Sequence, residues 1–382
     1  MAVYLSLKEI WRNRGRFLLV SLVIALITLL VLFIAGLAEG LGAGNIEYLS
    51  KLNAEVIVYQ SNSQLSIGSS RLDRSKLNDV ARIDGVQAVG PIGFSSASIV
   101  FADGTKPLDV SLIGIEPGRP GDPVVKQGRT FESRRANEVV LDLNAALRAK
   151  LKPGDEVTLK TVRGTKEELH TLRVAGISDG QQYSLRPSVF APDVTWDKIR
   201  AKGADTGEDL TYNIIAVKLA DPSHVKEIQQ IIPQRVERVE TADLVTAYKK
   251  TPGYAEQQAT LDTQRIFTLI IGVLVIGGFF QIQTLQKVPQ IGMLKAIGAP
   301  SRTVAIASIF QVTVVTIIGV AIGAAATLLL AANFPVTVPI VFKANTATTA
   351  IISLLLIGPI GGLVSVRYSL RIEPLRALGL GG

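Results

Sequence analysis

Four long apolar runs constrain this chain more than any other feature of its sequence. They cover residues 17–37, 266–282, 304–332 and 350–366. An α-helix rises 1.5 Å per residue, so about 20 apolar residues cross a hydrocarbon layer roughly 30 Å thick. Inside that layer every backbone donor and acceptor must be satisfied within the segment, and a helix achieves this. The sequence therefore predicts an α-helical membrane protein with four transmembrane helices.

A polar block of more than two hundred residues lies between the first and second apolar runs. Segments such as 55–59, 138–141 and 214–219 have the β-branched content of strands, and helical patterns lie between them. This mixture favours an α+β domain, in which the strand-rich segment 95–190 forms one lobe and its flanks fold together as the other. Residues 241–262 are polar and helix-prone, so we expect them to extend the second transmembrane helix outward.

Placing helices on the apolar runs divides the chain into nine segments. They are a cytoplasmic amphipathic helix at 1–16, a first transmembrane helix at 17–40, an extracellular α+β domain at 41–258, a second transmembrane helix at 259–285, a short cytoplasmic helix at 286–303, a third transmembrane helix at 304–332, an extracellular loop at 333–346, a fourth transmembrane helix at 347–368 and a cytoplasmic tail at 369–382. The first run is longer than the 7–15 residues of a signal-peptide core, so we expect it to remain as a span.

The charges of the short segments set the expected orientation. The segments before the first run, between the second and third runs and after the fourth run hold ten cations and two anions. That excess equals the whole formal net charge of +8, whereas residues 43–260 are neutral overall. Because short Lys/Arg-rich segments stay in the cytoplasm, we expect both termini inside the cell and the large domain outside. The basic balance thus reports membrane topology and argues against nucleic-acid binding.

The residues that common enzymes and metal sites need are scarce. The chain has no cysteine, which excludes disulfides and thiolate metal sites, and neither His170 nor His224 has zinc-like or triad-like neighbours. It also lacks a Gly-x4-Gly-Lys-Ser/Thr phosphate loop and a Gly-x-Ser-x-Gly nucleophile elbow. We therefore expect no enzymatic activity, no intrinsic cofactor and no binding of ATP at a loop of this kind.

The stretch between the second and third runs is a short amphipathic segment. Ile291, Leu294 and Ile297 recur every third residue and form an apolar ridge, which Lys287 and Lys295 flank. Small residues within it let another backbone come close; these are Gly292, Ala296 and Gly298. The pattern fits a connector that lies at the membrane surface, and it also fits a helix that inserts into a groove of a cytoplasmic partner.

Residues 291–299, Ile-Gly-Met-Leu-Lys-Ala-Ile-Gly-Ala, resemble the coupling segment of MacB/FtsX-like permeases of ABC transporters. The one-plus-three layout of apolar runs and the tail sequence Arg371-Ile-Glu-Pro-Leu are similar as well. The resemblance implies a homodimeric permease that works with two copies of a separate ABC ATPase, which pushes on residues 287–300 and on the N-terminal helix. It also implies mechanotransmission, in which substrate is taken from the outer leaflet or the outside space without a full tunnel.

One departure from the family pattern concerns the start of this coupling helix. Gln290 stands where the family usually has an acid, and Pro289 precedes it. Proline is well suited to the first turn of a helix, so we expect the helix to begin here. The missing acid leaves open which ion pair fastens the ATPase.

Glu39 is the only acid between Glu9 and Glu47, and it lies near the outer end of the first run beside Gly36 and Gly40. Ionisable groups within membrane segments are functional candidates, and glycines let a second helix or a flat ligand come close. In a symmetric dimer two Glu39 carboxylates would face each other and hold an iron or a cationic group. A carboxylate solvated at the level of the lipid headgroups is the alternative interpretation.

The first span contains Arg14-Gly-Arg-Phe, Leu26-Ile-Thr-Leu-Leu and Ala35-Gly-Leu-Ala-Glu-Gly-Leu-Gly-Ala-Gly-Asn45. These stretches resemble the first span of haem-exporting permeases of Gram-positive bacteria, which remove excess haem from the membrane. This implies haem as a transported substrate and a location in the cell membrane of a Gram-positive bacterium. The implied substrate site comprises Glu39, Phe33, Gly36, Gly40, Tyr48 and Arg265, with the haem iron at Glu39 as its only metal. Arg265 would meet a haem propionate or pair with Asp262.

Two other functions fit the same layout. An FtsX-like transmembrane signalling permease would regulate an extracellular partner without transport. An exporter of lipid or peptide would use the same membrane architecture with a different substrate. Stimulation of the ATPase by a small molecule would favour transport, and a protein partner of the large domain would favour signalling.

Overall fold

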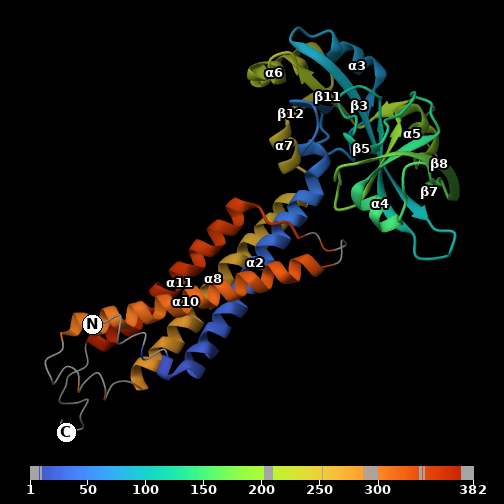
Figure 1. Cartoon of the computed structure of the whole chain (residues 1–382). Helices are drawn as coiled ribbons and strands as arrows, with labels where there is room; N and C mark the ends of the chain where they lie inside the picture. Colours follow the sequence, from blue (N-terminus) through green and yellow to red (C-terminus); the bar gives the residue numbers. More distant parts are fainter. Residues whose placement is uncertain are drawn as a thin grey trace. The chain divides into compact units, whose positions relative to one another are not determined.

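The computed structural model describes residues 8, 11–201, 210–251, 253–286, 289, 293, 300–334, 338 and 340–370. The chain forms two compact units (Figure 1). The first, called the helical unit here, comprises Met1–Gly40 and Gln258–Gly382, and the second, called the sheet domain, comprises Leu41–Gln257. Each unit has its own hydrophobic core.

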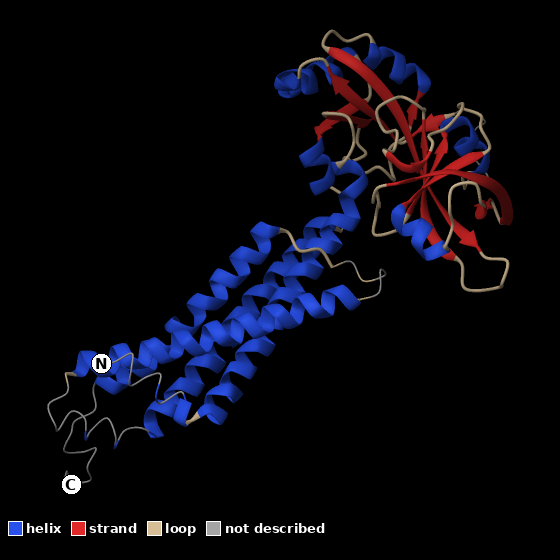
Figure 2. Ribbon diagram, in the orientation of Figure 1, coloured by secondary structure: helices blue, strands red, loops and turns tan. Residues whose placement is uncertain are grey.

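Four long helices account for most of the described part of the helical unit (Figure 2). They are α2 (Arg14–Ser50), α8 (Tyr254–Gln286), α10 (Ser301–Asn333) and α11 (Ala344–Leu370). In the described residues three stretches are long and apolar enough to cross a membrane, namely Arg14–Gly44, Tyr254–Phe279 and Ile306–Asn333. Helix α11 contributes only a shorter apolar stretch, Ala344–Leu356, so the fourth span stays a prediction.

Two glycines allow α10 to pack closely against α2. Gly319 and Gly323 lie four residues apart, and therefore on one face of α10. A Cβ atom at Gly319 would lie 2.6 Å from Cβ of Ile24, and one at Gly323 would lie 2.5 Å from the carbonyl oxygen of Ala25. A larger residue does not fit at either place, which is typical of tightly packed membrane helices. The core around this contact consists of Phe17, Val20, Ile24, Val31, Leu32, Ile276, Val312, Val315, Val320, Ala350 and Leu354.

A ten-stranded sheet organises the described part of the sheet domain (Figure 2). Its strands are β1 (Val56–Gln60), β3 (Val86–Val100), β4 (Leu108–Ile115), β5 (Val125–Gly128), β6 (Glu138–Asp142), β7 (Glu156–Arg163), β8 (Lys166–Ser178), β9 (Ser188–Pro192), β11 (Ile214–Leu219) and β12 (Val239–Asp243). Their order is β12-β1-β11-β3-β4-β9-β6-β8-β5, and β7 pairs with β3 and β8. Neighbours are antiparallel except in the pairs β4–β9 and β6–β8. Strands β2 (Leu72–Asp73) and β10 (Thr211–Tyr212) form a separate small sheet.

Short helices pack against the sheet, and aspartates fix the start of two of them. The helices are α3 (Arg74–Ala81), α4 (Leu143–Ala149), α5 (Asp193–Ile199), α6 (Val225–Arg235) after a 3-10 turn at Pro222–His224, and α7 (Leu244–Lys249). Asp142 caps α4 by accepting from the backbone N–H of Ala145, and its other oxygen accepts from that of Ser188 at 2.9 Å. Burial raises the pKa of Asp142 to about 6. Asp243 caps α7 in the same way.

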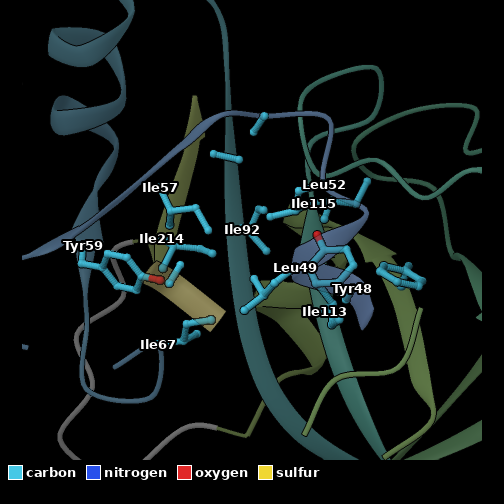
Figure 3. Packing of buried hydrophobic residues seen from close by; sticks show 14 of the residues in the cluster. Tyr48, Leu49, Leu52, Ile57, Tyr59, Ile67, Ile92, Ile113, Ile115 and Ile214 are labelled. Carbon is cyan, nitrogen blue, oxygen red and sulfur yellow. The ribbon is translucent and has the colours of Figure 1, made fainter. Parts of the chain in front are cut away.

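The sheet domain has two lobes joined by a shared core. One hydrophobic cluster draws only on residues between 97 and 199, and another draws on residues 56–89 and 215–239. A third cluster joins them, and in it Tyr48 and Leu49 of α2 pack with Ile92, Ile113 and Ile115 of the two central strands (Figure 3). The predicted division into a 95–190 lobe and a lobe made of its flanks agrees with this arrangement.

The indole of Trp196 lies on a flat surface made by two glycines. Gly93 of β3 and Gly114 of β4 are directly paired across the two strands. A Cβ atom at Gly93 would lie 2.2 Å from the ring of Trp196, and one at Gly114 would lie 2.3 Å from its Cγ atom. The indole N–H donates to Oγ of Ser95 at 3.1 Å and to the carbonyl of Leu112 at 3.3 Å. This contact fixes α5 on the sheet.

Two parts of the sheet domain differ from what the sequence suggests. Residues 86–92 and 97–102 each have a strand-like sequence, and the structure joins 86–100 in one strand, β3. The predicted helical extension over 241–262 is not one continuous helix, because β12 (Val239–Asp243) takes its first three residues, α7 (Leu244–Lys249) is a separate short helix and α8 begins only at Tyr254. All five residues of β12 pair with β1, which gives hydrogen-bond partners to the backbone groups of β12 on that side. This pairing outweighs the local helix propensity of the segment. Strands β5 and β9 were not predicted.

Candidate functional site

Glu39 lies in the C-terminal half of α2 and is held by two residues that are distant in sequence. Its Oε1 atom forms an ion pair with Nζ of Lys343, and its Oε2 atom accepts a hydrogen bond of 3.2 Å from Oγ1 of Thr346. The Glu39 side chain is 20% exposed and that of Lys343 is 63% exposed. Each oxygen of the carboxylate therefore has one polar partner.

Lys343 reaches Glu39 because residues 340–343, called the strap here, lie along α2. The backbone N–H of Val341 donates to the carbonyl oxygen of Gly36 at 3.0 Å. A Cβ atom at Gly36 would lie 2.7 Å from the ring of Phe342 and 3.0 Å from Ile340. Glycine at position 36 is thus what lets the strap lie directly on α2, one helical turn before Glu39.

An apolar pocket adjoins the strap. It is lined by Leu29, Phe33, Thr327, Leu330, Ala331, Phe334, Ile340 and Phe342. The rings of Phe33 and Phe334 lie 5.7 Å apart between centroids, and the cavity measures about 10 Å³. That volume is close to the space of one water molecule, so a larger ligand needs the strap or the helices to move.

The other predicted substrate residues differ in how close they lie to Glu39. Gly36 and Gly40 are buried in the same helix as Glu39, and Phe33 contributes to the pocket. Arg265 of α8 is half-buried, and the described residues include no ion pair between it and Asp262.

Tyr48 belongs to the core of the sheet domain. Its side chain is completely buried, its ring packs against Phe94 and Phe190, and its hydroxyl donates to the carbonyl of Gly121 at 3.0 Å. Burial raises the pKa of the phenol well above its ordinary value. The phenol is enclosed in this core, where a ligand beside Glu39 does not reach its oxygen, so Tyr48 is removed from the candidate site.

The structure does not describe the residues that were predicted to couple the permease to the ATPase. Lys287, Gln290, Ile291, Gly292, Leu294, Lys295, Ala296 and Gly298 all lie outside the described residues. The amphipathic pattern at 286–303 therefore stays a prediction.

Sequence reasoning missed Lys343 and Thr346 as partners of Glu39, although a signal was present. Lys343 is the only charged residue between Arg302 and Arg367, and Glu39 is the only one between Phe17 and Ile46. Two isolated charges of opposite sign that lie at or beside the ends of apolar runs are expected to pair, because an unpaired charge near a low-dielectric environment is costly.

The structure defines a membrane protein with a large α+β domain inserted after its first apolar helix. Family comparison makes this specific. The MacB-like periplasmic core domain matches residues 17–235, and the FtsX-like permease C-terminal region matches residues 266–374. The chain belongs to the MacB/FtsX-like family of ABC-transporter permeases, membrane subunits that work with a separate ATPase subunit and are not themselves ATPases.

Several relatives align with the chain from end to end. A Staphylococcus haemolyticus protein, named as a candidate hemin transport system permease (HrtB), is 28% identical over 98% of this chain and 99% of its own length. Its Staphylococcus epidermidis counterpart is 27% identical over 99% of both chains. An uncharacterised ABC transporter permease of Mycobacterium bovis is 23% identical over 99% of both. Among solved structures, the periplasmic region of MacB from Actinobacillus actinomycetemcomitans is 21% identical over 53% of this chain and 93% of its own, with a TM-score of 0.36.

Proposed function

We propose that this chain is the permease subunit of an ABC efflux transporter that removes a hydrophobic substrate, haem in the first place, from the cell membrane of a Gram-positive bacterium. The observation that carries the proposal is the end-to-end similarity to staphylococcal permeases that are named for hemin transport. The permease acts as a homodimer with two copies of a separate ATPase.

The carboxylate of Glu39 gives the proposal a chemical basis. Among the described residues no group of three or more His, Cys, Asp or Glu side chains could hold a metal within one chain. Haem iron can take one ligand on each of its two faces, and two Glu39 carboxylates from the two copies of a dimer would supply them. Carboxylates are uncommon haem ligands, and weak ligation suits a substrate that has to be released.

The surroundings of Glu39 suit a flat hydrophobic molecule. Phe33 supplies an aromatic wall, and Gly36 and Gly40 add no side chain of their own to α2. The strap takes up the space over Gly36, so a flat ligand that binds there displaces it. Arg265 remains a candidate partner for a propionate group. In this proposal haem is cargo, and the chain carries no resident cofactor.

Energy would reach this site by mechanotransmission. Nucleotide-driven closure of the ATPases would act on residues 287–300 and on the N-terminal helix, and the membrane helices would then carry the movement outward. This step rests on the family resemblance and on the charge pattern that places both segments in the cytoplasm.

The test is the ATPase activity of the reconstituted complex. The permease and its ATPase are placed in lipid nanodiscs, and turnover is measured with haem, iron-free protoporphyrin, lipids and peptides. We expect stimulation by haem, and a Soret absorption band on the purified permease that is lost in Glu39→Ala. Glu47→Ala serves as the matched control, because Glu47 lies on the same helix but pairs with Lys51 at 2.8 Å.

Other outcomes would redirect the function. A colourless permease whose complex ignores haem and responds to a lipid or a peptide would indicate an exporter of that substrate. A complex that responds to no small molecule, together with an extracellular protein bound to the sheet domain, would indicate an FtsX-like signalling permease.

A further inference from the structure

Lys343 and Glu39 are the two isolated charges of their segments, and the structure brings them together. The contact joins α2 to the strap, whose position on α2 is fixed by the Val341–Gly36 hydrogen bond and by Phe342. Thr346 of α11 completes the arrangement by donating to the second carboxylate oxygen. A ligand that binds the Glu39 carboxylate therefore competes with Lys343 and Thr346 for its oxygens.

Lys343 is the partner that exchanges more easily. Its side chain is 63% exposed, whereas that of Glu39 is 20% exposed, so water already competes for the ammonium group. Four flexible carbons carry that ammonium, which lets it turn to a new partner without movement of the backbone. Thr346 lies in the first turn of α11 and has a short side chain, so it has less freedom to follow a ligand.

We infer that Lys343 is a specificity-determining residue that exchanges the carboxylate of Glu39 for a carboxylate of the substrate. Before binding, the ammonium neutralises Glu39. When a metal or cationic centre of the ligand takes the Glu39 carboxylate, the ammonium is released and pairs with an acidic group at the edge of the ligand. The number of ion pairs is conserved, so the exchange leaves neither the Lys343 ammonium nor the partly buried Glu39 carboxylate without a partner.

This inference rests on the proposed function and narrows its substrate class. The preferred ligand is flat and hydrophobic, has a metal or cationic centre, and carries at least one carboxylate. A ligand that lacks the carboxylate still reaches Glu39 but leaves Lys343 without a partner, and it therefore binds more weakly.

The experiment compares haem with its dimethyl ester, which has the same ring and iron but no free carboxylate. Dissociation constants are measured by Soret titration of the full-length permease in nanodiscs, for the wild type and for Lys343→Met. We expect the wild type to prefer haem over the ester by about tenfold, and Lys343→Met to bring that ratio close to one. Lys343→Arg should keep most of the preference, because it retains the positive charge.

Thr346→Val is the matched control. It removes the hydrogen bond to the other oxygen of Glu39 but no charge, so it should change both affinities by the same factor and leave their ratio unaltered. Each comparison uses the ratio of the two dissociation constants, for haem and for its ester, measured on one protein. The two ligands partition differently into the lipid, but this difference is the same for every variant and therefore cancels when the ratios are compared. Gel filtration and thermal unfolding confirm that each variant is folded.

The results separate failure of the inference from failure of the proposed function. If the wild type binds both ligands and Lys343→Met tightens both equally, Lys343 merely covers Glu39 and the inference is wrong while haem remains the substrate. If the wild type binds neither ligand, the proposed function fails, and the inference fails with it.

Discussion

Replacing Gly114 by alanine tests the packing of the sheet domain where α5 lies closest to β4. The added methyl would lie 2.3 Å from Cγ and 2.7 Å from Cβ of Trp196, whereas ordinary contacts between carbon atoms are about 3.5 Å or more. Because the Cβ atom of Trp196 is itself too close, rotation of the indole does not relieve the clash. Helix α5 has to move away from the sheet by about 1 Å.

The expected loss of stability follows from this displacement. Overpacking of a close-packed core costs about 1–3 kcal/mol. The indole N–H also loses good geometry to Ser95 and Leu112, which adds about 1 kcal/mol. The sum is roughly 2–4 kcal/mol, which for a domain of this size lowers the midpoint of thermal unfolding by roughly 5–15 °C.

The chain itself supplies the assay. It has two tryptophans, Trp11 and Trp196, so Trp11→Phe leaves the buried indole as the only tryptophan fluorophore. Gly68→Ala is the matched control, since its nearest neighbour would be Oγ of Ser66 at 4.0 Å. If Gly114→Ala unfolds within about 1 °C of Gly68→Ala, the close contact between α5 and the sheet is not rigid and the reasoning is refuted.

Three further predictions concern other parts of the molecule. Asp142 is protonated more readily in the folded chain than in the unfolded chain, so the stability of the sheet domain should fall by about 3 kcal/mol as the pH rises from about 4 through 6. Denaturation at several pH values should show no such fall for Asp142→Asn, and the same pH dependence in the variant and the wild type would contradict this assignment. Gly323→Ile should separate α10 from α2 and lower the yield of folded permease severalfold by gel filtration, whereas Gly278→Ile, which meets no atom within 4 Å at its Cβ, should not; equal yields would contradict the packing. Lys295→Glu should abolish stimulation of the partner ATPase by haem while leaving the Soret band intact, and normal stimulation would argue against a coupling role for this segment.

The sequence was most informative where a strong period or a strong charge asymmetry was present. Apolar runs indicated the long helices because chain length and hydrocarbon thickness are directly related. β-branched segments indicated strands such as β6 and β11, whose residues are nearly all buried. Strand β12 was missed because its polar residues owe their conformation to pairing with β1, a contact that lies far away in sequence.

In the candidate site, the sequence indicated Glu39 but not its partners, because these contacts also join segments that are far apart in the sequence. Glu39 stood out because it is an isolated acid in an apolar run. Its partner lies more than three hundred residues later, and nothing local to Lys343 indicates that the strap returns to α2. Tyr48 illustrates the opposite error, since closeness to Glu39 in sequence suggested a shared site, whereas the continuing helix buries its ring among Phe94 and Phe190.

Strand β3 has a consequence for how such domains can be recombined. Its fifteen residues supply Val89 to one hydrophobic cluster and Ala97 and Ile99 to the other. A chimera that exchanged only the segment after residue 95 would cut this strand and give each half a foreign neighbour. Grafting between relatives should therefore succeed at connections such as Asp103-Gly104 and fail within the strand. A relative that exchanges one lobe by recombination has to keep a β3 strand that fits both lobes.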